Sequence, residues 1–202
     1  RNKGLVKTVN FSASKYVGDP INAVRIFNEK EVDELIVLDI DATATDRGPD
    51  TTMVAHLAAE CRMPLCYGGG VKTVEQAKTV IGLGVEKVAI SSAAVENPGL
   101  VSRIAAEIGA QSVVIVLDVR KSRGRSGYEV FTRNGTVATG KCPVDFARQL
   151  ENQGAGEIVI NSIDRDGEMK GYDMALATQV RDAISLPMTV LGGAGSLKHV
   201  GE

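Results

Sequence analysis

The stretch Glu34-Leu35-Ile36-Val37 decides the fold, because it returns 123 residues later as Glu157-Ile158-Val159-Ile160. Three further pairs match at the same offset: Asp41 with Asp164, Pro64 with Pro187, and Gly69-Gly70 with Gly192-Gly193. A repeat of this size indicates two half-units of about four strand–helix modules each. Two such halves make the eight modules of a (β/α)₈ barrel, the TIM-barrel fold.

The rest of the chain alternates in the same way between apolar runs and amphipathic windows of helical period. The expected strands are Gly4–Phe11, Leu35–Ile40, Leu65–Tyr67, Lys87–Ile90, Val113–Asp118, Glu157–Asn161 and Met188–Leu191. The expected helices are Asn22–Glu29, Thr52–Cys61, Val74–Leu83, Leu100–Ile108, Val144–Gln153 and Met174–Ile184. Strand followed by helix, six times over, predicts a parallel α/β fold. The segment Tyr128–Thr139, with Asn134-Gly135 inside it, predicts an inserted β-hairpin.

The length of the chain limits how much of a barrel it can form. A (β/α)₈ barrel typically needs ~250 residues, and this chain has 202. We therefore expect a single domain over residues 1–202 that is an incomplete barrel. Its first strand should be clipped and its eighth module missing.

The composition excludes several classes of protein. The chain is 44% hydrophobic and 24% charged, which is typical of a globular domain and not of a disordered or fibrous one. A formal net charge of −2 gives no electrostatic reason to expect binding to nucleic acid or to a membrane surface. No apolar run reaches the ~18 residues of a membrane span, and no signal peptide is recognisable, so we expect a cytoplasmic protein.

The cysteines and histidines suggest no metal, disulfide or catalytic triad. Cys61, Cys66 and Cys142 have neither the spacing of a metal site nor that of a disulfide framework, and we interpret them as core residues. His56 lies on an expected helix and His199 near the end of the chain, away from the glycine loops. We expect no metal and no cofactor.

Two glycine loops follow expected strands, Gly68-Gly69-Gly70 and Gly192-Gly193-Ala194-Gly195. Active sites of TIM barrels lie at the carboxyl ends of the strands. Glycine lets backbone N–H groups approach a phosphate closely, although it also serves in tight turns that bind nothing. Ser91-Ser92 and Asp166-Gly167 can add donors beside the two loops. The two loops together predict a ligand with a phosphate at each end, stretched across the barrel mouth.

Carboxylates at strand ends would lie near the middle of such a ligand. Asp118 closes a run of pure hydrophobes, and is either a general acid/base or the partner of Arg120 or Lys121. Asp39 and Asp164 also follow strands, with a structural role equally open for each. At the opposite face, Glu34, Lys87 and Glu157 each begin a strand. These three are either a salt-bridged plug or a gate into the barrel.

The same residues carry a resemblance to a known family that covers essentially the whole chain. Ser162–Gly167 followed by Gly171-Tyr172-Asp173 is its most specific part. The other matching segments are Asp33–Ile40, Tyr67–Val71, Lys87–Pro98, Gly156-Glu157 and Gly192–Gly195. The sequence resembles the cyclase subunit of imidazole glycerol phosphate synthase, a lyase of histidine biosynthesis.

The resemblance implies a reaction and a partner. Members of this family take ammonia from a glutaminase subunit, with which they pair. They combine it with a bis-phosphorylated ribulosyl-aminoimidazole substrate to give imidazole glycerol phosphate and an aminoimidazole carboxamide nucleotide. The two phosphates of that substrate fit the two glycine loops.

The resemblance also assigns roles to single residues. Asp118 matches one of two catalytic aspartates, the other being expected at or before the start of this chain. The implied phosphate-site residues are Gly69, Gly70, Ser91, Ser92, Asp166, Gly167, Gly192 and Gly193. The implied polar positions of the active face are Lys7, Asp39, Asn161 and Asp164. Glu34, Lys87 and Glu157 match three members of a charged gate through which ammonia enters.

Several positions depart from the family pattern. Asn161 stands where Thr is usual, Leu191 where Ser is usual, and Glu86 replaces an Asp of the glutaminase interface. Three segments resemble a paralogous branch instead: Gly4–Thr8, Tyr16–Pro20 and Asn28–Leu35. That branch works with an amidotransferase in acetamidino-sugar synthesis for surface polysaccharide, such as lipopolysaccharide. A non-catalytic barrel that only activates a glutaminase is the third hypothesis.

Overall fold

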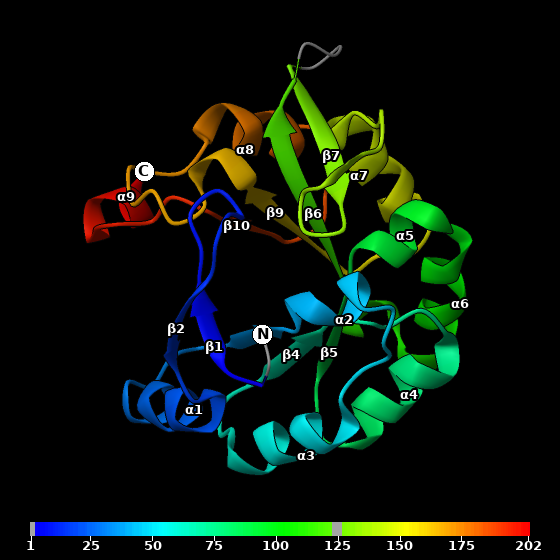
Figure 1. Cartoon of the computed structure of the whole chain (residues 1–202). Helices are drawn as coiled ribbons and strands as arrows, with labels where there is room; N and C mark the ends of the chain where they lie inside the picture. The colour runs from blue at the N-terminus through cyan, green and yellow to red at the C-terminus, as the bar shows by residue number, and fades with distance from the viewer. Residues whose placement is uncertain (1–2, 123–126) are drawn as a thin grey trace.

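A curved sheet of six parallel strands organises the protein in a computed structural model that describes residues 3–122 and 127–202. The strands are β3 (Leu35–Leu38), β4 (Leu65–Gly68), β5 (Lys87–Ile90), β6 (Val113–Lys121), β9 (Glu157–Ser162) and β10 (Met188–Leu191). They pair in the order β10-β9-β6-β5-β4-β3, and the sheet curls into part of a ring (Figure 1). This is the architecture of an incomplete (β/α)₈ barrel.

Six helices follow the strands and cover the outer face of the ring (Figure 1). They are α1 (Pro20–Glu29), α3 (Thr51–Glu60), α4 (Val74–Gly82), α6 (Gly99–Ile108), α7 (Pro143–Asn152) and α8 (Met174–Arg181). All six were predicted to within a few residues from their amphipathic period, and polar side chains cap the starts of α1, α3, α4 and α8. Thr73 and Gln76, for example, form a capping box at the start of α4.

Short helical segments in the loops were not predicted. They are α2 (Ile40–Ala44), α5 (Ser92–Glu96), α9 (Leu197–Gly201) and the 3₁₀ turns Ala110–Ser112 and Ile163–Arg165. Each is too short to show a helical period in the sequence. Of the described helices, none has the length and apolar character needed to span a membrane.

The prediction of a barrel strand over Gly4–Phe11 is wrong. Strand β1 (Leu5–Lys7) pairs antiparallel with β2 (Lys15–Gly18) in a separate two-stranded sheet. The run is interrupted because Asn10 and Phe11 adopt positive φ angles of 51° and 58°, where a strand cannot continue. The hairpin lies on the open side of the ring (Figure 1).

The predicted hairpin within Tyr128–Thr139 is confirmed as β7 (Tyr128–Thr132) and β8 (Val137–Ala138). Strand β7 also pairs antiparallel with the end of β6, so the hairpin extends the sheet beyond the barrel mouth. Arg133 and Asn134 at its tip have φ angles of 52° and 56°, the left-handed conformation that tight hairpin turns require.

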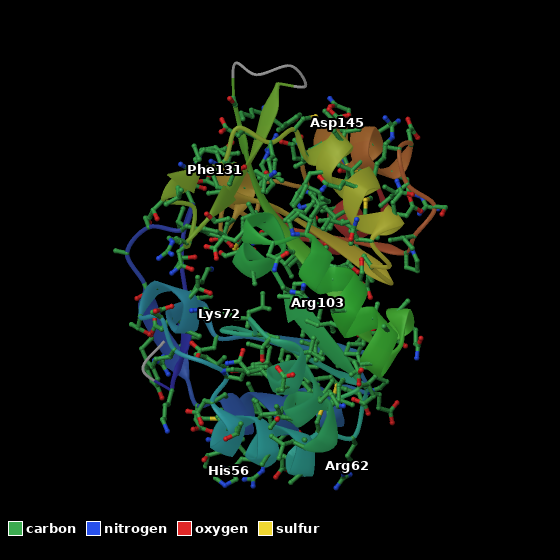
Figure 2. All side chains as sticks on the ribbon, turned by 90° about the vertical axis from the view of Figure 1, so that its right-hand side faces the viewer. His56, Arg62, Lys72, Arg103, Phe131 and Asp145 are labelled. Atoms are coloured by element: carbon green, nitrogen blue, oxygen red, sulfur yellow. The ribbon has the colours of Figure 1, made fainter. Side chains whose placement is uncertain are left out.

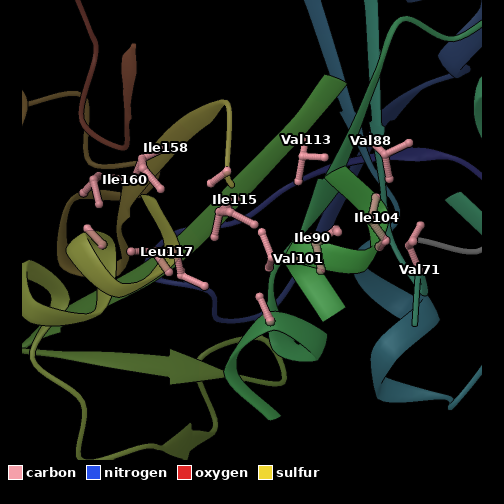
Figure 3. Close-up of a cluster of buried hydrophobic side chains, with 14 of the residues drawn as sticks. Val71, Val88, Ile90, Val101, Ile104, Val113, Ile115, Leu117, Ile158 and Ile160 are labelled. Carbon is pink, nitrogen blue, oxygen red and sulfur yellow. The ribbon is translucent and has the colours of Figure 1, made fainter. Parts of the chain in front are cut away.

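Side chains alternate along each strand between two apolar layers. On β6, Val113, Ile115 and Leu117 join the large core between sheet and helices (Figure 3). The intervening Val114 and Val116 join a second, smaller cluster. Its other members are Cys66, Ala89 and Val159, with Ile36 and Leu191 packed against them. Since Asp118 is next in the second series, alternation places it at the upper end of the smaller cluster.

Candidate active site

A cavity of about 450 Å³ opens at the carboxyl ends of the strands. Nine of the residues singled out in the sequence line it: Asp39, Gly69, Gly70, Ser91, Ser92, Asp118, Asn161, Asp166 and Gly192. They come from the ends of β3, β4, β5, β6, β9 and β10 and the loops that follow. Parallel strands bring these positions to one edge of the sheet, which is why residues far apart in the chain meet.

Asp118 on β6 lies opposite Asn161 on β9, and the Asn161 Nδ2 donates a hydrogen bond to Asp118 Oδ1 at 3.0 Å. Burial raises the pKa of the Asp118 carboxyl to about 7, while the Asn161 bond opposes the rise and the charge of Asp166 adds to it. A carboxyl that titrates near neutral pH can both accept and donate a proton.

Asp118 does not form an ion pair with the basic residues that follow it. The Arg120 side chain and the Lys121 backbone interact with Asp164 instead. The Arg120 Nε lies 3.7 Å from Asp164 Oδ1, and the Lys121 backbone N–H donates to Asp164 Oδ2 at 2.8 Å. Asp164 therefore has local partners, and it does not line the cavity.

The first glycine loop turns sharply over the end of β4. Gly70 has a φ of 73°, and a Cβ there would come within 2.5 Å of the Arg47 carbonyl oxygen. A glycine is thus required by the backbone itself, with or without a ligand. Ser91 and Ser92 border the same side of the cavity, and the Ser92 hydroxyl accepts from the Arg133 N–H at 3.4 Å.

The second glycine loop faces the cavity only in part. Gly192 lines it, whereas Gly193 is buried with its carbonyl accepting from the Gly171 N–H at 2.8 Å. Gly167 packs closely against the backbone of Thr8 and also lies outside the lining. Asp166 does face the cavity, and it accepts a hydrogen bond from the Thr8 hydroxyl at 2.6 Å.

Two polar residues expected at the active face, Lys7 and Asp39, differ in their position relative to the cavity. Lys7 on β1 is exposed, with its Nζ 3.9 Å from Met169 Sδ, and does not line the cavity. Asp39 lines the cavity but caps α2, accepting from the Asp41 N–H at 3.0 Å. A side chain engaged in capping is less free to act on a ligand.

The three charged residues at the opposite ends of the strands meet as a cluster. The Lys87 Nζ lies 2.9 Å from Glu34 and 3.0 Å from Glu157. Burial opposes the charge of Lys87, but hydrogen bonds to both carboxylates outweigh it and raise its pKa. Thr189, which the sequence analysis did not single out, donates its hydroxyl to Glu157 at 2.8 Å. The two ion pairs link the amino-terminal ends of β3, β5 and β9.

Comparison with known proteins places the chain in a family. The model of the histidine biosynthesis protein family matches residues 1–202. The chain belongs to this family. A Vibrio vulnificus protein with the provisional designation imidazole glycerol phosphate synthase subunit hisF3 is 51% identical over 202 residues, which cover 100% of this chain and 78% of that protein.

Two further members of the histidine biosynthesis family show the range of similarity. A Leptospira interrogans protein, provisionally designated imidazole glycerol phosphate synthase subunit HisF, is 54% identical over 197 residues, covering 98% of this chain and 78% of its own. The imidazole glycerol phosphate synthase subunit HisF of Clostridium botulinum is 38% identical over 198 residues, with the same coverage.

Four residues that line the cavity come from loops that the sequence analysis did not assign to the site. Phe11, Lys72, Arg133 and Asn134 all line the cavity. Asn134-Gly135 marks a turn in the sequence, but nothing local indicates that the turn reaches the mouth. Asn134 Nδ2 donates to the Ile40 carbonyl at 2.8 Å, which holds the hairpin tip there.

Histidine and possible metal ligands were also considered as candidate functional residues. His56 projects from the outer side of α3 (Figure 2). Within residues 3–122 and 127–202, no three His, Cys, Asp or Glu side chains gather closely enough to hold a metal ion.

Proposed function

We propose that this chain is the cyclase subunit of an imidazole glycerol phosphate synthase. The proposal rests above all on Asp118, a half-buried carboxyl in the cavity between two glycine loops, whose pKa desolvation raises to about 7. The names of the Clostridium botulinum and Leptospira interrogans relatives support the same reaction. The substrate is a bis-phosphorylated ribulosyl-aminoimidazole, and the products are imidazole glycerol phosphate and an aminoimidazole carboxamide nucleotide.

In this proposal the two phosphates bind at the two ends of the cavity. Gly69, Gly70, Ser91 and Ser92 hold one phosphate. Asp166, Gly167, Gly192 and Gly193 belong to the loops around the other, with Gly167 and Gly193 shaping the backbone from behind. The middle of the substrate then lies over Asp118, with Asn161 orienting the carboxylate. Asp118 takes a proton from the attacking nitrogen and returns one as the substrate is cleaved.

Ammonia reaches this centre from a glutaminase subunit on the opposite face. Glu34, Lys87 and Glu157 form the entrance, which opens when the Lys87 ion pairs separate. Beyond them lies the smaller apolar cluster, which includes Cys66 and Val116. Its environment is so poorly hydrated that burial raises the pKa of the Cys66 thiol to about 12. Such a path favours neutral ammonia over the ammonium ion.

Replacement of the central carboxyl tests the proposal. Asp118→Asn should lower turnover with ammonium salts about 10²–10⁴-fold, because a general acid/base is lost, while substrate still binds. Asp164→Asn is the matched control, since Asp164 lies outside the cavity lining. Turnover of Asp118→Asn within twofold of the parent, or an equal loss in the control, would contradict the role of Asp118. Absence of any turnover in the parent protein with its glutaminase would contradict the proposed reaction.

A further inference from the structure

The walls of the cavity carry charge unevenly. Among the described lining residues, the carboxylates are Asp39, Asp46, Glu96, Asp118 and Asp166, and the cations are Lys72 and Arg133. Both cations lie on the side of the first glycine loop. Lys72 follows Gly70 by two residues, and the Arg133 N–H contacts the Ser92 hydroxyl. The end beside Gly192 carries the Asp166 carboxylate instead.

Arg133 is held at this place by the hairpin that carries it. The bond from the Asn134 side chain to the Ile40 carbonyl ties the tip to the start of α2. Gly135 packs beside Ile163 and Phe11, so the tip lies against segments from three separate parts of the chain. The Arg133 side chain therefore projects from a turn that is held in place at the mouth of the cavity.

The present partners of both cations are solvent-exposed carboxylates. The Arg133 Nη2 lies 3.8 Å from Glu96 Oε1, and the Glu96 side chain is 60% exposed. Lys72 pairs with Asp46, whose side chain is 86% exposed. Exposed ion pairs of this kind contribute little to stability. A phosphate can therefore take over both cations at small cost, and arginine offers it two parallel N–H groups.

We infer that Arg133 and Lys72 make the end of the cavity beside Gly70 and Ser92 the anchoring site for a phosphate dianion. The two phosphates of the ligand then bind unequally. This end offers two cations whose exposed partners, Glu96 and Asp46, can turn away into solvent, whereas the other end offers a carboxylate and backbone groups. The inference rests on the proposed function, which supplies the doubly phosphorylated ligand. It adds Arg133 and Lys72 to the phosphate-binding residues, and it says which of the two phosphates binds more tightly.

Amide NMR spectra of the purified protein, titrated with inorganic phosphate at pH 8, test the inference. In the parent protein, the Gly70 and Ser92 amides should shift at a lower phosphate concentration than the Gly192 and Gly193 amides. Arg133→Gln should raise the midpoint for Gly70 and Ser92 at least tenfold, since a charge-assisted bond is lost. The midpoint for Gly192 and Gly193 should not move.

Two further variants sharpen the result. Arg103→Gln is the matched control, because Arg103 lies on the outer face of α6 (Figure 2), and it should change neither midpoint. Glu96→Gln should lower the midpoint for Gly70 and Ser92 about twofold or more, because phosphate no longer competes with that carboxylate. This variant decides the matter even where Arg133→Gln fails to fold.

The outcomes separate the inference from the proposed function. Equal midpoints at the two ends, or unchanged midpoints in Arg133→Gln or Glu96→Gln, would overturn the inference and leave the proposed reaction standing. If the cavity amides of the parent protein shift neither with inorganic phosphate nor with a bis-phosphorylated ligand, the inference and the proposed function are both overturned.

Discussion

Lys87 pairs with two carboxylates, those of Glu34 and Glu157. Replacing it by a neutral side chain of similar length measures how much its charge contributes to the free energy of unfolding. In Lys87→Met, Glu34 and Glu157 would face each other without the ammonium group that now lies about 3 Å from both. Removing one partner of a fully buried pair costs about 3–5 kcal/mol, whereas exposed pairs contribute about 0–1 kcal/mol. The side chains of Lys87, Glu34 and Glu157 are 25%, 32% and 12% exposed, which lies between these limits.

We therefore expect Lys87→Met to lose about 2 kcal/mol of unfolding free energy at pH 8, the midpoint between those ranges. For a chain of this length that is about 4–8 °C in Tm. The loss should shrink at high ionic strength, because dissolved salt screens the repulsion between the two carboxylates. Chemical denaturation at low and at high ionic strength measures the difference.

A matched control is available on the outer surface. Lys78 pairs with Glu107 at 2.9 Å, but both side chains are about half exposed. Lys78→Met should leave the denaturation midpoint unchanged. Equal effects in the two variants, or a loss for Lys87→Met that does not depend on ionic strength, would refute the reasoning. If the cluster is a gate, Lys87→Met should also keep its turnover with ammonium salts while glutamine-dependent turnover falls. A plug would lower both alike.

Two other predictions follow from the site. Asp118→Asn should be more stable than the parent at pH 8, and this advantage should vanish only below about pH 4, the pKa of an unfolded aspartate. The folded-state pKa of about 7 lies above that of the unfolded chain, so the parent loses stability as pH rises between the two values, and the variant does not. Gly193→Ala should lose about 1–3 kcal/mol in the same assay, because its φ of 105° is strained for alanine and the new Cβ would overlap the Gly171 carbonyl. An alanine variant as stable as the parent would show that the loop can shift.

The sequence was most informative where a single local signal sufficed. Strands such as Lys87–Ile90 and Met188–Leu191 were predicted with their observed bounds, since apolar runs between turn residues leave little choice. The repeat between Glu34 and Glu157 predicted the barrel and placed both at one end of it. Asp118 was found because a charge at the end of a purely apolar run is unusual.

Predictions that depended on distant contacts were less successful. Gly4–Phe11 has the composition of a strand, but the positive φ angles of Asn10 and Phe11 turn it into a hairpin. Lys7 was expected at the active face; its Nζ lies 3.9 Å from Met169 Sδ, in the loop after β9, and its role there stays a prediction. Arg133 could not be found from its neighbours, because its place at the cavity depends on a hydrogen bond between Asn134 and Ile40, 94 residues apart.

The two apolar layers differ in size, and therefore in how many neighbours a substitution disturbs. The large layer between sheet and helices holds Ile115, Leu117 and Ile158, and any change of volume there disturbs many neighbours. The inner layer, with Cys66 and Ala89, has far fewer members, so a substitution there disturbs fewer neighbours. Its members are still almost fully buried, so a polar side chain there would need a hydrogen-bond partner. A change of size confined to the inner layer therefore alters the interior of the ring while the packing between sheet and helices stays unchanged.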